Sequence, residues 1–287
     1  SESNEIENLN ILTKGSIPED CSCLLITTLK EDITEMEKDA IIDYSSKGGK
    51  ILLLANGNIS GINTPNFDEI LNLYGFNLST GILMEQDSDK MLYNSPEFIL
   101  STVDSSILSK NTKMNMNLCL IGASQIKFKD EADLENLGIT YSTIAETSSE
   151  AFLRNNFNIT SSSKTNQDID AGDSIVGALV TRSLEDGNSA EMIVYSNAIF
   201  ATNQKVNIGN NYAMYANKLC NNDDIVNVSI SYLTKRTDTI TIRKDSDSVS
   251  YTVTQKEHNV IVGIIFLVPA LIIICGIIVW QIRRRKK

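Results

Sequence analysis

Apolar and polar positions along the first part of the chain form blocks that predict a strand, a helix and a second strand. The run CLLITTL (Cys23 to Leu29) is short and apolar, which is typical of a strand buried on both faces. The next block, DITEMEKDAIIDYSSKGGK, has the spacing of an amphipathic helix that ends at Gly48 and Gly49. The run KILLLA (Lys50 to Ala55) predicts a second buried strand. A strand, a helix and a strand in this order form a right-handed βαβ unit of a parallel sheet.

The predicted helix in this block carries a signal at its start. Thr34 is followed three residues later by Glu37, which is the spacing of a capping box. The apolar face that we expect to be buried consists of Met36, Ala40, Ile41 and Tyr44.

A second helix is predicted over NFDEILNLYG, with Gly75 at its end. Its apolar face consists of Phe67, Ile70, Leu71 and Tyr74. Later apolar runs predict strands at Leu118 to Gly122, Ile139 to Glu146, Ser174 to Ser183 and Ala190 to Phe200, and a helix at Asn211 to Leu219. The fold class that follows is α/β, with a mostly parallel sheet flanked by helices.

Near the C-terminus, an uncharged apolar run extends from Val260 to Trp280. Roughly 20 apolar residues, at about 1.5 Å each, match a hydrocarbon core of about 30 Å. We therefore expect one C-terminal transmembrane helix at 259–282, rather than a buried core helix. The residues after it are all basic: Arg283, Arg284, Arg285, Lys286 and Lys287. The positive-inside bias places this tail in the cytoplasm and the rest of the chain outside the membrane.

Four residues of this segment suit a membrane helix. Gly263, Pro269 and Gly276 would allow close packing on another helix, although a lone anchor tolerates them too. Trp280 suits the headgroup layer at the cytoplasmic end. The first residue is Ser, and SESNEIENLN has none of the features of a signal peptide. Because an external domain must be exported, we expect a signal or membrane segment upstream in the natural protein.

The remaining chain divides into one domain and a linker. We expect an extracytoplasmic α/β domain over 1–235, with a weakly patterned region at about 85–117 and a polar loop at about 155–173. The stretches ITIRK and VSYTVTQ alternate apolar and polar residues, which predicts a membrane-proximal β-hairpin within 236–258. The net charge is −11, and residues 1–282 carry −16, which argues against binding to nucleic acid.

The five cysteines do not form a disulfide framework. Cys275 lies in the apolar run, and Cys21 and Cys23 are too close in sequence to pair well with each other. We interpret these two, Cys119 and Cys220 as small core residues in preference to a bridge, and their disulfide state stays open.

Catalytic chemistry has little support in the residue types. The only histidine is His258, at the predicted membrane edge, so the domain has no imidazole for a Ser-His-Asp or Cys-His arrangement. No phosphate-binding loop is present. Asp168, Asp170 and Asp173 could hold a cation, but a solvated acidic loop is the favoured interpretation. We therefore predict no catalytic residue, no cofactor and no metal.

Several segments, in their order and spacing, resemble the GldG-like family, the gliding-motility-associated auxiliary component of ABC-2 type transport systems. They include IPEDCSCLLITTLKEDITEMEKDAIIDYSSKGGKILLL, ILNLYGFNLSTGIL, YSTIAETSSEAF, MIVYSNAIFATNQ, GNNYAMYANKL and the final LVPALIIICGIIVWQIRRRKK. The resemblance implies a glutamine-amidotransferase-like or flavodoxin-like sheet outside the membrane. It also implies a non-catalytic subunit, working with an ABC permease and a cytoplasmic ATPase.

Two other functions remain open. A free-standing surface binding or adhesion module would place a pocket at the carboxyl ends of the parallel strands, lined by the loops after Ala55 and Gly122. A surface hydrolase that uses only carboxylates would need two acids converging in such a pocket.

Overall fold

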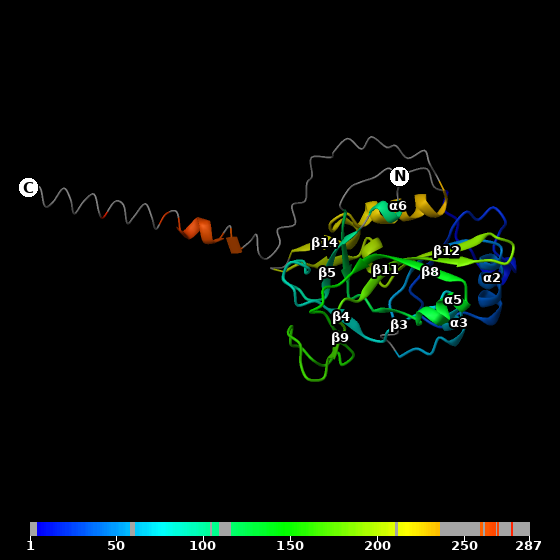
Figure 1. Ribbon diagram of the computed structural model, residues 1–287. Helices are drawn as coiled ribbons and strands as arrows, with labels where there is room; N and C mark the ends of the chain where they lie inside the picture. Colours follow the sequence, from blue (N-terminus) through cyan, green and yellow to red (C-terminus); the bar gives the residue numbers. More distant parts are fainter. Residues whose placement is uncertain are drawn as a thin grey trace, which may run out of the picture.

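The centre of the protein is a five-stranded sheet with helices on both faces (Figure 1). The computed structural model describes residues 5–57, 61–103, 105–108, 116–209, 212–235, 259–260, 262–267, 269 and 277. The strands of the sheet lie in the order β1 (Leu24–Thr27), β2 (Lys50–Leu54), β12 (Ser189–Tyr195), β11 (Ile175–Ser183) and β8 (Ile139–Glu146). The strand β2 is buried along most of its length, since it has a neighbouring strand on each side and a core on each face.

The sheet is mixed, so the prediction of a mostly parallel sheet is wrong for half of it. The pairs β1–β2 and β2–β12 are parallel, whereas β12–β11 and β11–β8 are antiparallel. The reason is the short connection between β11 and β12, which turns at Gly187 with a φ of 82°. The N–H of Leu184 bonds to the carbonyl of Asn188 at 2.9 Å across this turn. A connection this short joins antiparallel strands only, because a parallel crossover needs about a dozen residues or more.

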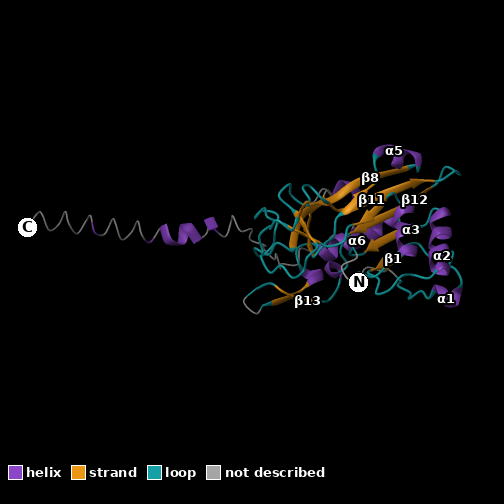
Figure 2. Cartoon of the chain, turned by 90° about the horizontal axis from the view of Figure 1, so that it is seen from below, coloured by secondary structure: helices purple, strands orange, loops and turns teal. Residues whose placement is uncertain are grey.

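Alternate side chains of β2 point into two separate cores. Ile51 and Leu53 belong to the core under α2 (Glu35–Ser46) and α3 (Pro65–Leu73). Leu52 and Leu54 belong to the core under α6 (Asn222–Leu233) on the opposite face. The helices α1 (Ile11–Lys14), α2 and α3 lie together beside the sheet in Figure 2. This three-layer arrangement explains why apolar and polar residues do not alternate along β2.

The predicted start of α2 is confirmed. The Thr34 hydroxyl accepts from the Glu37 N–H, and the Glu37 carboxylate accepts from the Thr34 N–H at 2.8 Å, so both halves of the capping box are present. Gly48 follows the helix with a φ of 83°, a conformation that glycine adopts without strain. Two details of the prediction are wrong. Met36 is 52% exposed, and Leu25 of β1 is also 52% exposed, because β1 is an edge strand with one open face.

The predicted helix at Asn211 to Leu219 is wrong. The described part of that stretch contains a short strand, β14 (Ala213–Tyr215), and a 3₁₀ turn, η2 (Ala216–Lys218). The strand β14 pairs with β13 (Lys205–Asn207), and this hairpin precedes α6, a helix that the sequence patterns did not reveal.

Smaller elements complete the described domain. They are β3 (Phe76–Leu78) with β7 (Ile126–Phe128), β5 (Phe98–Val103) with β6 (Met116–Ile121), and the sheet of β4 (Ile82–Met84), β9 (Phe152–Arg154) and β10 (Ile169–Asp170). Short helices are α4 (Ser105–Leu108), α5 (Glu131–Asn136) and η1 (Ile199–Ala201). The β5–β6 hairpin shows that the weakly patterned region at 85–117 contains regular structure.

The C-terminal predictions fall largely outside the described residues. The membrane-proximal hairpin at 236–258, Gly276, Trp280 and the basic tail at 283–287 are not described. Residues 259–260, 262–267, 269 and 277 are helical. Within the part of the chain that the structure describes, no single helix has the length and apolar character needed to cross a bilayer.

Candidate functional site

The polar loop between β9 and β10 is organised around a buried ion pair. Arg154 ends β9, and Asp168 precedes β10; their side chains are 4% and 0% exposed. The sequence predicted a solvated acidic loop here. That prediction is confirmed for Asp170, which is 90% exposed, and is wrong for Asp168.

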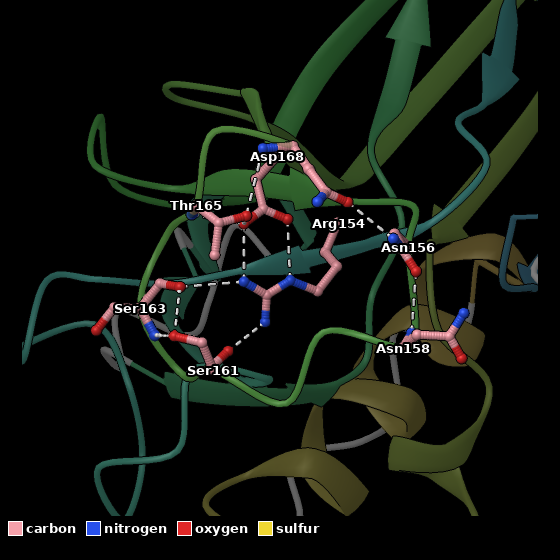
Figure 3. Close-up of polar contacts among 8 residues, drawn as sticks. Arg154, Asn156, Asn158, Ser161, Ser163, Thr165 and Asp168 are labelled. Carbon is pink, nitrogen blue, oxygen red and sulfur yellow. Dashed lines mark hydrogen bonds and ion pairs between the residues drawn. The ribbon is translucent and has the colours of Figure 1, made fainter.

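The guanidinium of Arg154 holds the loop through several hydrogen bonds at once (Figure 3). Its Nε donates to Asp168 Oδ1 at 2.9 Å, and its Nη2 donates to Asp168 Oδ2 at 2.8 Å. Two further N–H groups donate to the carbonyls of Ser161 and Ser163 on the far side of the loop. The bidentate pair is the strongest geometry available to these two residues. The arginine thus ties the middle and the end of the loop to β9.

Asp168 receives further bonds from within the loop. The N–H and hydroxyl of Thr165 donate to Asp168 Oδ2 at 2.8 and 2.9 Å. The Arg154 guanidinium also lies 5.1 Å from the centroid of the Phe152 ring, which is a cation–π distance. These bonds compensate both buried charges, as buried charges require. We name Arg154, Asp168 and the residues between them the clamped loop.

The hydrogen bonds from Arg154 hold the pKa of Asp168 well below its usual range, and the bonds from Thr165 act in the same direction against the opposing effect of burial. The same pairing raises the pKa of Arg154. A carboxyl group with a lower pKa in the folded state contributes stability above its unfolded pKa of about 3.9. That contribution is lost as pH falls through the folded pKa.

Acidification is therefore expected to reduce the difference in thermal stability between the wild-type chain and the Asp168→Asn variant. The amide cannot gain a proton, so its contribution does not change over the interval in which Asp168 becomes protonated. Thermal unfolding of the full-length chain, measured from about pH 6 down to about pH 2, tests this prediction through the linkage between proton binding and stability. The gap between the two midpoints should narrow below about pH 4. A gap that stays constant would contradict the assignment.

The three aspartates flagged by the sequence have separate roles. Asp168 is bound by Arg154, Asp170 forms an ion pair with Lys164, and Asp173 is exposed. Among the residues that the structure describes, no group of three or more His, Cys, Asp or Glu side chains could hold a metal ion.

The loops after Ala55 and Gly122 meet at the carboxyl ends of the parallel strands, and they bond to each other there. Asn56 Nδ2 donates to the Gly122 carbonyl at 2.9 Å, and the Gly57 N–H donates to Ser124 Oγ at 2.8 Å. A Cβ at Gly57 would lie 1.9 Å from the Ser79 carbonyl oxygen, so the backbones are in close contact.

A groove of about 720 Å³ lies elsewhere, beside the β11–β12 turn. Arg182 lines it and donates from Nη1 to the buried hydroxyl of Ser45 at 3.2 Å. Glu185 and Asp186 lie in the same wall, so the groove has mixed charge. Such a lining selects neither an anion nor a cation strongly.

Glu85 is a buried polar residue that the sequence patterns did not reveal. Its side chain is fully buried after β4 and accepts from the N–H and the hydroxyl of Ser148 at 2.9 and 2.6 Å. It also accepts from the N–H groups of Gln86 and Asp87. These bonds join the start of the weakly patterned region to the turn before β9. No residue spacing in the sequence signals this pairing.

The fold defines a class of protein with a mixed five-stranded sheet flanked by helices. No protein-family model matches the chain, and no curated protein matches it. Among solved structures, the chain is similar to the N-terminal domain of mmIFT52, with 15% sequence identity, a TM-score of 0.48, and coverage of 74% of this chain and 77% of that one. It is also similar to a ThuA-like protein from Bacteroides uniformis ATCC 8492, with 13% identity, a TM-score of 0.37, and coverage of 73% of this chain and 68% of that one.

Proposed function

We propose that this chain is a non-catalytic accessory subunit of an ABC-2 type export system, of the GldG-like kind. Its α/β domain lies outside the membrane. The segment from Val260 to Trp280 crosses the bilayer beside the permease, and the basic tail at 283–287 lies in the cytoplasm, where the ATPase binds the permease.

The observation that carries this proposal is the exposed apolar surface of the C-terminal segment. Its described residues expose large apolar side chains, by 37% to 74%: Val260, Val262, Ile264, Ile265, Phe266, Leu267 and Ile277. Contiguous apolar surface of this kind marks a membrane or protein contact. The run has no charged residue over 21 positions, which favours the bilayer.

Two features support a permease as the neighbour of this segment. A Cβ at Gly263 would meet no described atom within 4 Å, so this side of the helix leaves room for a second helix to approach closely. Pro269 removes one backbone hydrogen-bond donor, and a neighbouring helix can satisfy the carbonyl that it leaves.

The clamped loop is our candidate for the contact outside the membrane. It displays Phe157, which is 49% exposed, on a loop that Arg154 holds at the carbonyls of Ser161 and Ser163 and at the carboxylate of Asp168. A preorganised loop loses less conformational entropy on binding than a mobile one, so an exposed aromatic on it is well suited to a partner contact.

Photo-cross-linking tests this arrangement in intact cells. A photoreactive phenylalanine analogue would replace Phe266 in the span, Phe157 in the clamped loop, or Leu12, which is 54% exposed on α1. We expect adducts with a polytopic membrane protein from the first two positions and none from Leu12. Adducts only with lipid at Phe266, and none at Phe157, would show that the chain has no permease beside it.

A further inference from the structure

Two cysteines that are distant in sequence meet in a small core beneath the β13–β14 hairpin. Cys119 lies on β6 and is completely buried, and Cys220 lies between η2 and α6 and is partly buried. Both pack in one cluster with Leu92, Phe98, Val206, Ala216 and Leu219. A side-chain hydrogen bond between Cys119 and Cys220 places the two thiols next to each other within this cluster.

The backbone around both cysteines is held in register by hydrogen bonds. Asn222 accepts from the Cys119 N–H at 2.9 Å and donates to the Cys119 carbonyl at 2.9 Å. Asn221 bonds to Asn117 in the same reciprocal way, through its side-chain oxygen at 3.0 Å and its own N–H at 2.9 Å. These four bonds join Asn221 and Asn222, the two residues that follow Cys220, to Asn117 and Cys119 on β6. The cysteines therefore cannot move apart without breaking buried hydrogen bonds.

Cys220 also has a φ of 51°, in the left-handed region where a residue other than glycine is strained. Strained conformations of this kind persist where the surrounding structure holds them, and they often occur at functional positions.

We propose that Cys119 and Cys220 form a disulfide when the folded domain meets a disulfide oxidant, such as a thiol–disulfide oxidoreductase or oxidised glutathione. The bond would link the segment just before α6 to β6, one of the two strands of the β5–β6 hairpin. The inference goes beyond the proposed function, because it requires an oxidising compartment and no permease. It revises the sequence interpretation of these two residues as simple core residues.

The exchange has a defined order and balance. Cys220 is the more accessible thiol, so its thiolate attacks the oxidant disulfide, forms a mixed disulfide and releases one thiolate of the oxidant. The Cys119 thiolate then attacks the Cys220 sulfur of the mixed disulfide and releases the second thiolate of the oxidant. The two cysteines lose two electrons and two protons, and the oxidant disulfide becomes two thiols. The hydrogen bond to Cys220 and burial raise the pKa of Cys119, so the second step is expected to be the slower one.

The test uses the full-length chain in detergent, with Cys21→Ser, Cys23→Ser and Cys275→Ser combined so that only this pair remains. After incubation with oxidised glutathione, we expect the intact mass to fall by two hydrogen atoms and one peptide pair, containing Cys119 and Cys220, to be linked. The midpoint of thermal unfolding should rise by about 5–15 °C, because the bond closes a long loop of the unfolded chain. A reductant should reverse both changes.

The matched control adds Cys220→Ser to the same background. This change affects a partly buried residue, so the domain should still fold, and oxidation should then leave the midpoint unchanged. The inference is overturned if both thiols of the pair-only chain still react with a maleimide after oxidation and denaturation. It is equally overturned if oxidation links Cys119 or Cys220 only to glutathione or to a second copy of the chain.

Discussion

Replacement of Asp168 by Asn is expected to lower the free energy of unfolding by about 1.5–3 kcal/mol, since it removes a charged hydrogen-bond partner of Arg154. Both side chains are almost fully buried, so water cannot replace the lost carboxylate without opening the loop. Urea unfolding of the full-length chain measures the global effect. If the loop opens alone, limited proteolysis should detect more cleavage within 155–168 in the variant than in the wild-type protein.

Two control variants distinguish the effect of breaking the ion pair from the effect of removing any one carboxylate. Asp170→Asn changes the same residue type at a 90% exposed position two residues away, and it should leave both the urea midpoint and the proteolysis pattern unchanged. The double variant Arg154→Met/Asp168→Leu removes both charges, and it should destabilise the protein less than Asp168→Asn alone. A double variant at least as unstable as the single variant would show that the loop depends on the polar bonds rather than on charge balance.

Two arginines near the centre of the apolar run are expected to remove the chain from the membrane. Leu267→Arg and Leu271→Arg each cost about 2.5–3.5 kcal/mol at the middle of an inserted helix, so the pair costs about 5–7 kcal/mol. Carbonate extraction of cell membranes measures the result. The wild-type chain should stay in the pellet, and most of the double variant should appear in the supernatant.

The control for this second prediction is Leu12→Arg. It makes the same change at a residue that is already 54% exposed on α1 of the folded domain, so it should leave the chain in the pellet. A double variant that also resists extraction would mean that the apolar run is not what holds the chain in the membrane.

Elements with a local cause were predictable from the sequence, and those that depend on distant contacts were not. The Thr34–Glu37 capping box, the face of α3 and the bounds of β8 all follow from spacings within one segment. Strand direction depends on which strands pair, and only the short turn at Gly187 carried a local sign of the antiparallel half. The helix α6 was not predicted, and buried polar residues such as Asn222 and Ser229 interrupt its apolar face.

The candidate site was predicted only in outline. The polar composition of 155–173 correctly predicts a loop up to β10 at Ile169–Asp170, but burial of Asp168 depends on Arg154, which is fourteen residues earlier. The contact between Cys119 and Cys220 joins segments about a hundred residues apart, and no sequence spacing predicts it. The burial of Glu85 could not be predicted either, because its hydrogen-bond partner Ser148 lies in a different part of the chain.

The central claim is that the chain is a subunit of an export system, and purification of the full-length native protein from membranes in a mild detergent tests it most directly. The account predicts that an ABC ATPase and its permease copurify with the chain in near-equal amounts. A chain that emerges alone and monodisperse from membranes containing those proteins would contradict it.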